Sequence, residues 1–280
     1  MAIDGNEKAD ESKHEGLRKM PLTGEMATLL IPLYAKALDS RSKHSILHDT
    51  KADELVRSID YDFDMLKSYG NGSVMVARAK QIDEWVREFI GLKSNAVVLN
   101  LGCGLDSRVS RINPPPGISW FDVDFPEVIG ERQKFYSNRE GYQTIASSIT
   151  APGWLEQTPK GRPAIVVADG VLEYLSESEV KALLNRIIDY FPGGQVAFDV
   201  MNTFAINSGK SDLKKQTGAE HKWAVDDLGT VDGLDPKLKR IACVAILRSK
   251  YLPLKDRLFF GLASVAPNFR DMLRLLLYEF

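Results

Sequence analysis

The chain has 280 residues, of which 44% are hydrophobic, and 36 basic against 38 acidic residues give it a formal net charge of −2. This length fits one medium-sized domain with additions, and the charge provides no broad positive field for nucleic acid or an anionic membrane. No stretch approaches the roughly 18 apolar residues of a membrane span, and no basic-then-apolar leader is present. Cys103 and Cys243 have no metal-ligand spacing around them. We therefore expect a cytoplasmic protein with reduced cysteines, no metal and a small-molecule partner.

The chain divides by pattern into a tail and one domain. Residues 1–19 are polar and charged without an apolar period, which is typical of a disordered tail. The remaining segments are expected to form one domain over 20–280. They are N-terminal helices over 20–92, an alternating core over 93–200, an insertion interpreted as a lid over 201–236, and the C-terminal end of the sheet over 237–280.

The last of the N-terminal helices is predicted to bury an arginine. Its apolar stripe follows the i, i+3, i+4, i+7 spacing and consists of Ile82, Trp85, Val86 and Phe89. Arg78 lies four residues earlier on the same face. Because an unpaired buried guanidinium costs several kcal/mol, Arg78 needs an anionic partner, either an internal carboxylate or a ligand.

From residue 96 the pattern alternates between strand and helix. Short apolar runs predict strands at 96–101, 119–124, 142–146, 163–168, 195–200 and 241–247. Helices are predicted between them, notably at 126–137 and 177–190, the second opened by a capping box of Ser176 and Glu179. This alternation is typical of a Rossmann-like α/β fold with a mostly parallel, doubly wound sheet.

A buried strand that ends in a glycine loop predicts a nucleotide site. Gly102 and Gly104 allow the backbone to approach a ligand where a Cβ would clash. The next strand ends in Asp122-Val123-Asp124, and an acid at that tip is placed to bind a ribose diol. Ligands of such sheets bind beyond the carboxyl ends of the strands, where the sequence also places Asp169.

The loop does not match a nicotinamide-binding fingerprint. The GxGxxG motif requires a third glycine, which is missing after Leu105, and a GxG pair alone is often only a tight turn. A ligand without phosphate, such as S-adenosylmethionine, fits the loop better than a dinucleotide.

Motifs along nearly the whole chain beyond the tail resemble the leucine carboxyl methyltransferase family, and within it the polyketide-type O-methyltransferases. They lie at 22–34, 59–63, 100–107, 120–129 and 222–227. The resemblance implies a class I methyltransferase fold with a seven-stranded sheet. It also implies S-adenosyl-L-methionine as cofactor and S-adenosyl-L-homocysteine as product.

Carried over residue by residue, the resemblance implies a cofactor site. Arg78 would bind the carboxylate of the methionyl end, which a guanidinium can hold with two hydrogen bonds. Gly102 and Gly104 would let the backbone pass the methionyl and ribose groups. Asp124 would accept hydrogen bonds from the ribose hydroxyls, with Asp122 as the second choice.

Three further positions depart from the common family pattern. Ser148, followed by Ile149, matches the adenine-contacting position, where Asp is common and would accept from the adenine amino group. Asp169 stands where Glu is commoner and has a shorter reach toward the cofactor. Glu173 stands where Met is common, so its carboxylate is either solvated or alters the substrate pocket.

The acceptor residues are less clearly indicated. A carboxylate acceptor is ionised at neutral pH, with a pKa near ~4, whereas a phenol near ~10 needs a base. His221 is the candidate base, although an exposed loop histidine is the plainer interpretation. Residues that flank strand ends or the cap are expected near the acceptor, although such residues are more often core: Tyr34, Tyr174, Met201, Asn202, Phe204, His221 and Trp223.

Three functions remain open at this point. The first is a small-molecule O-methyltransferase acting on a carboxylate or phenolic hydroxyl of an aromatic or polyketide-like acceptor. The second is a protein C-terminal carboxyl methyltransferase, which needs an open groove. The third is a cofactor-binding homologue without turnover, for which Ser148, Asp169 and Glu173 are the suspect departures. The oligomeric state is left open, and the missing third glycine disfavours a dehydrogenase.

Overall fold

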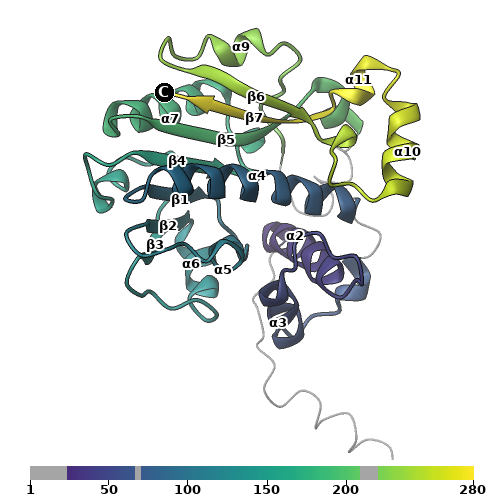
Figure 1. Cartoon of the computed structure of the whole chain (residues 1–280), viewed down its shortest axis with the longest axis horizontal. Helices are drawn as coiled ribbons and strands as arrows, with labels where there is room; N and C mark the ends of the chain where they lie inside the picture. The colour runs from purple at the N-terminus through teal and green to yellow at the C-terminus, as the bar shows by residue number, and fades with distance from the viewer. Residues whose placement is uncertain (1–23, 67–70, 209–219) are drawn as a thin grey trace, which may run out of the picture.

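The computed structural model describes residues 24–66, 71–208 and 220–280 (Figure 1). The tail predicted over 1–19 lies outside the described residues. One seven-stranded sheet has the order β3-β2-β1-β4-β5-β7-β6, in which only β7 runs antiparallel to its neighbours. The strands are β1 (Val97–Leu101), β2 (Ser119–Asp124), β3 (Tyr142–Ala146), β4 (Ala164–Ala168), β5 (Gly194–Met201), β6 (Lys239–Ala245) and β7 (Leu273–Glu279). The predicted fold class, a mostly parallel seven-stranded sheet, is confirmed.

The first five predicted strands agree with the structure to within one residue at each end. The sixth, predicted over 241–247, instead spans Lys239–Ala245, because a turn of 3-10 helix, η4 (Ile246–Arg248), ends it. No range had been predicted for β7, although it lies between β5 and β6 and supplies buried leucines from Leu275 to Leu277.

Helices occupy the region predicted for them and the connections between strands. No helix in the described segments is long and apolar enough to cross a membrane. The N-terminal helices are α2 (Gly24–Ser40), α3 (Thr50–Ser58), η1 (Phe63–Leu66) and α4 (Gly72–Leu92). Those of the core are α5 (Arg108–Ile112), α6 (Pro126–Arg132), η2 (Leu155–Gln157), η3 (Leu172–Tyr174) and α7 (Glu177–Tyr190). After β5 come α9 (Gly229–Asp232), α10 (Leu254–Ala263) and α11 (Pro267–Arg270).

Two helix predictions had different outcomes. Helix α7 begins and ends at the predicted residues, and both hydrogen bonds of the Ser176–Glu179 capping box are present. The helix predicted over 126–137 was too long, since α6 ends at Arg132. Beyond it the chain forms turns, and the ring of Tyr136 packs on the Arg132 guanidinium at 4.2 Å.

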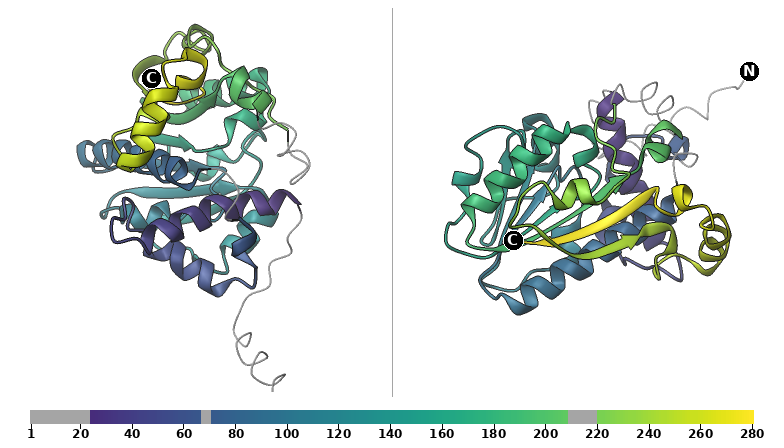
Figure 2. Two further views of the ribbon diagram at one scale, coloured as in Figure 1. Left: turned by 90° about the vertical axis from the view of Figure 1, so that its right-hand side faces the viewer. Right: turned by 90° about the horizontal axis from the view of Figure 1, so that it is seen from above.

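The sheet separates two apolar cores, and α4 and α7 cover its opposite faces (Figure 2). In strand β1, successive side chains point to opposite faces of the sheet and so contribute to both cores. Val97, Leu99 and Leu101 pack on the α7 side, whereas Val98 packs on the α4 side. The next residue on the α4 side is polar, Asn100, and it is 2% exposed. A polar layer therefore begins where β1 approaches the glycine loop.

The insertion predicted over 201–236 is described only in part. Met201 belongs to β5, residues 209–219 lie outside the described residues, and the segment from 220 leads to α9. Two backbone hydrogen bonds from Lys222 and Trp223 to the carbonyl of Glu173 attach this segment to η3. Its role as a lid remains a prediction.

Candidate functional site

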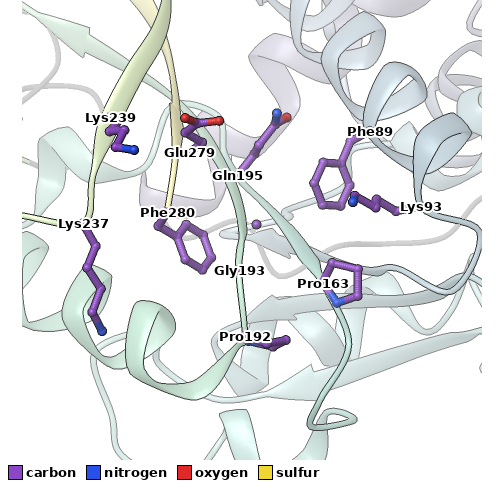
Figure 3. Close-up of a pocket in the computed structure, with 11 residues that line it drawn as sticks. Phe89, Lys93, Pro163, Pro192, Gly193, Gln195, Lys237, Lys239, Glu279 and Phe280 are labelled. Atoms are coloured by element: carbon purple, nitrogen blue, oxygen red, sulfur yellow. The ribbon is translucent and has the colours of Figure 1, made fainter.

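A hollow of about 470 Å³ lies at the amino-terminal edge of the sheet (Figure 3). Its titratable lining residues, Lys93, Lys237, Lys239 and Glu279, are all exposed, and Lys237 pairs with Asp189 at 3.2 Å. Ligands of doubly wound sheets bind at the opposite edge. We therefore do not assign the site to this hollow.

A second cavity, of about 280 Å³, lies at the carboxyl edge of the strands. Four parts of the chain line it: residues 29–36 of α2, the N-terminal half of α4 with Arg78, the end of β1 and the following loop over 100–108, and the segment over 169–174. The volume lies near the lower end for small-ligand pockets. The structure thus brings together Arg78, the glycine loop and Asp169, which are far apart in the sequence.

Both loop glycines have left-handed backbone conformations that the chain itself requires. Their φ angles are +57° at Gly102 and +49° at Gly104. A Cβ on Gly102 would lie 2.5 Å from a methyl of Val171, and one on Gly104 would lie 3.1 Å from a methyl of Leu29. A side chain at Gly102 would therefore disturb the loop before it met any ligand.

Gly102→Ala is expected to destabilise the protein by about 1–3 kcal/mol, because it combines a disfavoured φ with a clash. The free energy of unfolding in urea would measure this. The control is Gly91→Ala in α4, where a Cβ would meet nothing within 4 Å and the stability should rise by about 0.5–1 kcal/mol. Unchanged stability in Gly102→Ala would contradict the packing argument.

Asp124 holds the glycine loop in place. Its two carboxylate oxygens accept hydrogen bonds at 2.8 Å from the backbone N–H groups of Gly104 and Phe125. Burial raises the pKa of Asp124, against the effect of these hydrogen bonds. Each oxygen keeps a second lone pair, so a further donor such as a ribose hydroxyl can still bind.

Asp122, the second choice for the ribose, has a structural role instead. Its side chain is fully buried and paired with Arg132, and it accepts hydrogen bonds from Asn100, Trp120 and Tyr142 at 2.7–2.9 Å. The alternation of strand β2 puts Asp122 and Asp124 on one face, but only Asp124 reaches the strand end. The buried pair leaves Asp122 no free side for a ligand.

Arg78 has internal acidic partners, the first of the two alternatives considered from its sequence position. Its Nη1 donates to Asp199 at 2.8 Å, and its Nε lies 2.6 Å from an oxygen of Asp169. Burial alone would lower the pKa of Arg78, but Asp169 and Asp199 raise it above its ordinary value. Its Nη2, which lies against Gly170, makes no hydrogen bond to another described residue. One edge of the guanidinium is therefore available to an anion.

A buried ionic network, which sequence reasoning missed, surrounds this arginine. Arg108 has no exposed surface and donates to Asp83 at 2.8 Å and to Asp169 at 2.7 Å. Arg78 and Arg108 together hold the pKa of Asp169 below its usual value despite burial. The available signal was the pair Arg108 and Arg111 directly after the glycine loop, with Asp83 on the buried stripe of α4.

The same network fastens the N-terminal helices to the cavity. Lys36 of α2 donates to Asp106 at 2.7 Å. Arg111 donates to Asp106 and, at 2.6 Å, to Asp49, which also caps α3. The cavity wall that α2 forms is thus fixed by ion pairs as well as by apolar packing.

The predicted adenine position lies outside the residues that line the cavity. The Ser148 hydroxyl is within 2.8 Å of the Thr150 hydroxyl. Ile149 is 8% exposed, and its carbonyl accepts hydrogen bonds from Trp154 and Arg186 at 3.0 Å. Both follow β3, beside the end of β2 that carries Asp124. Their contact with adenine remains a prediction.

Of the residues expected near the acceptor, only Tyr174 lines the cavity. Its ring lies against that of His221, with centroids 5.1 Å apart. His221 is half-buried, its Nδ1 has no hydrogen-bond partner among the described residues, and burial lowers its pKa. His221 is therefore not the freely exposed loop histidine of the plainer interpretation.

The other acceptor candidates lie elsewhere. Tyr34 is 5% exposed and packs on Phe63, and Trp223 is 4% exposed in the core on the α7 side. Asn202 is also buried, and its side chain bonds to the backbone of Ala205 and Asn268. Met201 is partly exposed at the end of β5, and Phe204 is 45% exposed. Core packing thus accounts for Tyr34 and Trp223.

The strand order, with β7 antiparallel between β5 and β6, is that of a class I, Rossmann-like methyltransferase fold, and the family and relatives that follow make S-adenosylmethionine its cofactor. The chain belongs to the leucine carboxyl methyltransferase family, whose model matches residues 30–188. It is 38% identical over 265 residues to the tetracenomycin polyketide synthesis O-methyltransferase TcmP of Streptomyces glaucescens, covering 92% of this chain and 98% of TcmP. It is 30% identical to the S-adenosyl-L-methionine-dependent methyltransferase dpfgK of Gibberella zeae, covering 79% and 82%.

Solved structures share the fold at low identity. A DUF574 family protein from Streptomyces avermitilis has a TM-score of 0.58 at 11% identity, covering 90% of this chain and 96% of that chain. The plantazolicin methyltransferase BamL, solved with a desmethylplantazolicin analogue and S-adenosylhomocysteine, has a TM-score of 0.50 at 11% identity, covering 91% and 98%. These likenesses concern the arrangement of helices and strands.

Proposed function

We propose that this methyltransferase is an O-methyltransferase that modifies a carboxylate or phenolic hydroxyl of a small, aromatic or polyketide-like acceptor. The observation that carries the proposal is the cavity in which the glycine loop, the free edge of Arg78 and Tyr174 meet. The near full-length similarity to TcmP, named for O-methylation in polyketide synthesis, supports oxygen as the acceptor atom.

The residues present fit S-adenosylmethionine. Arg78 Nη2 would donate to the methionyl carboxylate, and Asp124 would accept from a ribose hydroxyl. The two loop glycines bring backbone, without side chains, to the cavity wall. When bound, the cofactor supplies an electrophilic methyl group on a sulfonium.

The role of the chain in methyl transfer is alignment and exclusion of water. A carboxylate acceptor is already ionised at neutral pH and needs no base. A phenol needs one, and His221, whose lowered pKa keeps it neutral near pH 7, would accept that proton. The contact with Tyr174 places His221 next to a residue of the cavity wall.

The test is incubation of the protein with S-adenosylmethionine and a panel of aromatic carboxylic acids and phenols, followed by mass spectrometry. We expect acceptors that gain one methyl group on oxygen. Mild alkali cleaves a methyl ester and leaves an aryl methyl ether intact, so hydrolysis identifies the methylated group. Methylation only of peptides with a free C-terminal carboxylate would favour a protein substrate. Cofactor binding without turnover on either set would favour the non-catalytic homologue.

A further inference from the structure

Glu173 differs from the other carboxyl groups around the cavity in having no ion-pair partner within residues 24–66, 71–208 and 220–280. It is 5% exposed and lines the cavity, and its Oε2 accepts no hydrogen bond from the described residues. By contrast, Asp106 pairs with Lys36, and Asp169 with Arg78 and Arg108. A buried acceptor without a donor costs about 1–3 kcal/mol, so it indicates a missing partner.

The charges around Glu173 come from four neighbouring parts of the chain. Arg78 of α4 is the nearest cation, but Asp169 after β4 and Asp199 of β5 already bind it. Tyr174, on the same short helix, contributes a phenol whose pKa burial raises. Burial, together with Asp199, raises the pKa of Glu173 to about 8, against the opposing effect of Arg78.

The attached segment adds no fixed countercharge. His221 lies against Tyr174 and is neutral near pH 7, because burial lowers its pKa. The Lys222 side chain is exposed, and only its backbone N–H bonds to the carbonyl of Glu173. Lys36, on the α2 wall, is paired with Asp106. Without ligand, the protonated form of Glu173 is therefore favoured at neutral pH.

We propose that the Glu173 carboxylate is the countercharge for the cationic part of the bound cofactor, its α-ammonium or its sulfonium. This inference rests on the assignment of the cavity to S-adenosylmethionine. Arg78 would bind the anionic end of the same molecule. A cation close to Glu173 stabilises its ionised form, so the proton leaves Glu173 as the cofactor binds.

The sign of the pH dependence follows from this linkage. Cofactor binding lowers the pKa of Glu173 below its free value of about 8. Below that pH, binding must also remove the proton from Glu173, which lowers the observed affinity. The affinity should therefore rise up to about tenfold per pH unit on approach to pH 8 and then level off.

The experiment is calorimetric titration of the full chain and of Glu173→Gln with S-adenosylmethionine from pH 6.5 to 8.5, in two buffers of different ionisation enthalpy. At pH 7 the unmodified protein should release close to one proton more than the variant. At pH 8.5 the unmodified protein should bind S-adenosylmethionine about tenfold more tightly than the variant does. At pH 6.5 the affinities of the two proteins should converge. The α-amino group of the cofactor titrates at about pH 8, so proton release is compared at pH 7, where that group is already mostly protonated in the free ligand.

Two further ligands show which cation is involved. S-adenosylhomocysteine keeps the ammonium and lacks the sulfonium, so an equal difference between the two proteins assigns the ammonium, and a difference confined to S-adenosylmethionine assigns the sulfonium. 5′-Methylthioadenosine carries neither cation and should bind both proteins equally. Wherever turnover is measurable, the variant should show a higher KM for S-adenosylmethionine at pH 8.5.

The inference is overturned if the unmodified protein binds S-adenosylmethionine with no extra proton release and the same pH profile as Glu173→Gln. A difference with 5′-methylthioadenosine would also overturn it, because that ligand has no cation to stabilise. Proton release by the unmodified protein gives an answer even if the variant is unstable. Each of these results is independent of whether the acceptor is a carboxylate or a phenol, which only product analysis addresses.

Discussion

Arg78→Lys is expected to weaken S-adenosylmethionine binding by about 1.5–3 kcal/mol, or roughly 10- to 150-fold. A lysine can neutralise Asp169 or Asp199, but it cannot bind both and also present a second edge to the methionyl carboxylate. Calorimetric titration would measure the affinity. The control is Arg57→Lys, at an exposed ion pair with Asp53, which should leave the affinity unchanged.

Arg78→Ala is a less specific test of the cofactor site, because it also removes internal ion pairs of the folded protein. The structure shows that alanine would leave the buried Asp199 carboxylate without its cation and Asp169 with Arg108 alone, and breaking a buried pair typically costs about 3–5 kcal/mol of stability. Normal cofactor affinity in Arg78→Lys would remove Arg78 from the binding site.

Arg132→Met is expected to destabilise the protein by about 3–5 kcal/mol, because it leaves Asp122 charged and fully buried. It also removes a hydrogen bond of 2.9 Å to the carbonyl of Gly104, so the glycine loop should lose order. The free energy of unfolding in urea would measure the first effect, and cofactor affinity the second.

A double variant separates the effect of the unpaired Asp122 charge from the other effects of replacing Arg132. Adding Asp122→Asn to Arg132→Met removes the unpaired charge and should recover part of the lost stability. Arg139→Met, at an exposed site near the same sheet edge, should change stability by no more than about 0.5 kcal/mol. Equal losses in the single and double variants would show that the pair itself contributes little.

The central strands of the sheet were predictable because they are buried on both faces. Such strands read as continuous apolar runs, as in Ala164–Ala168, and their ends coincide with glycine or polar residues. The end of α6 was not predictable in this way, because the helical pattern over 126–137 does not show the turns after Arg132, in which Tyr136 packs against the Arg132 guanidinium.

The site was predictable where backbone chemistry determines it. Gly102 and Gly104 have left-handed backbone conformations, and Arg78, which its stripe predicted to be buried, keeps 17% of its side-chain surface exposed. The different environments of Asp122 and Asp124 were not predictable. Both side chains lie on the same face of β2, and only their tertiary partners differ. The network of Arg108 and Arg111 was missed because its acids lie up to 62 residues away in the chain.

The central claim is that the cofactor binds at the carboxyl edge of the sheet, between the glycine loop and Arg78. A crystal structure of the protein with S-adenosylhomocysteine tests this directly. We expect the ligand in the cavity of about 280 Å³, with its carboxylate on Arg78 Nη2 and its ribose at Asp124. Ligand bound instead in the hollow lined by Phe89 and Pro163, with the carboxyl edge empty, would contradict the assignment.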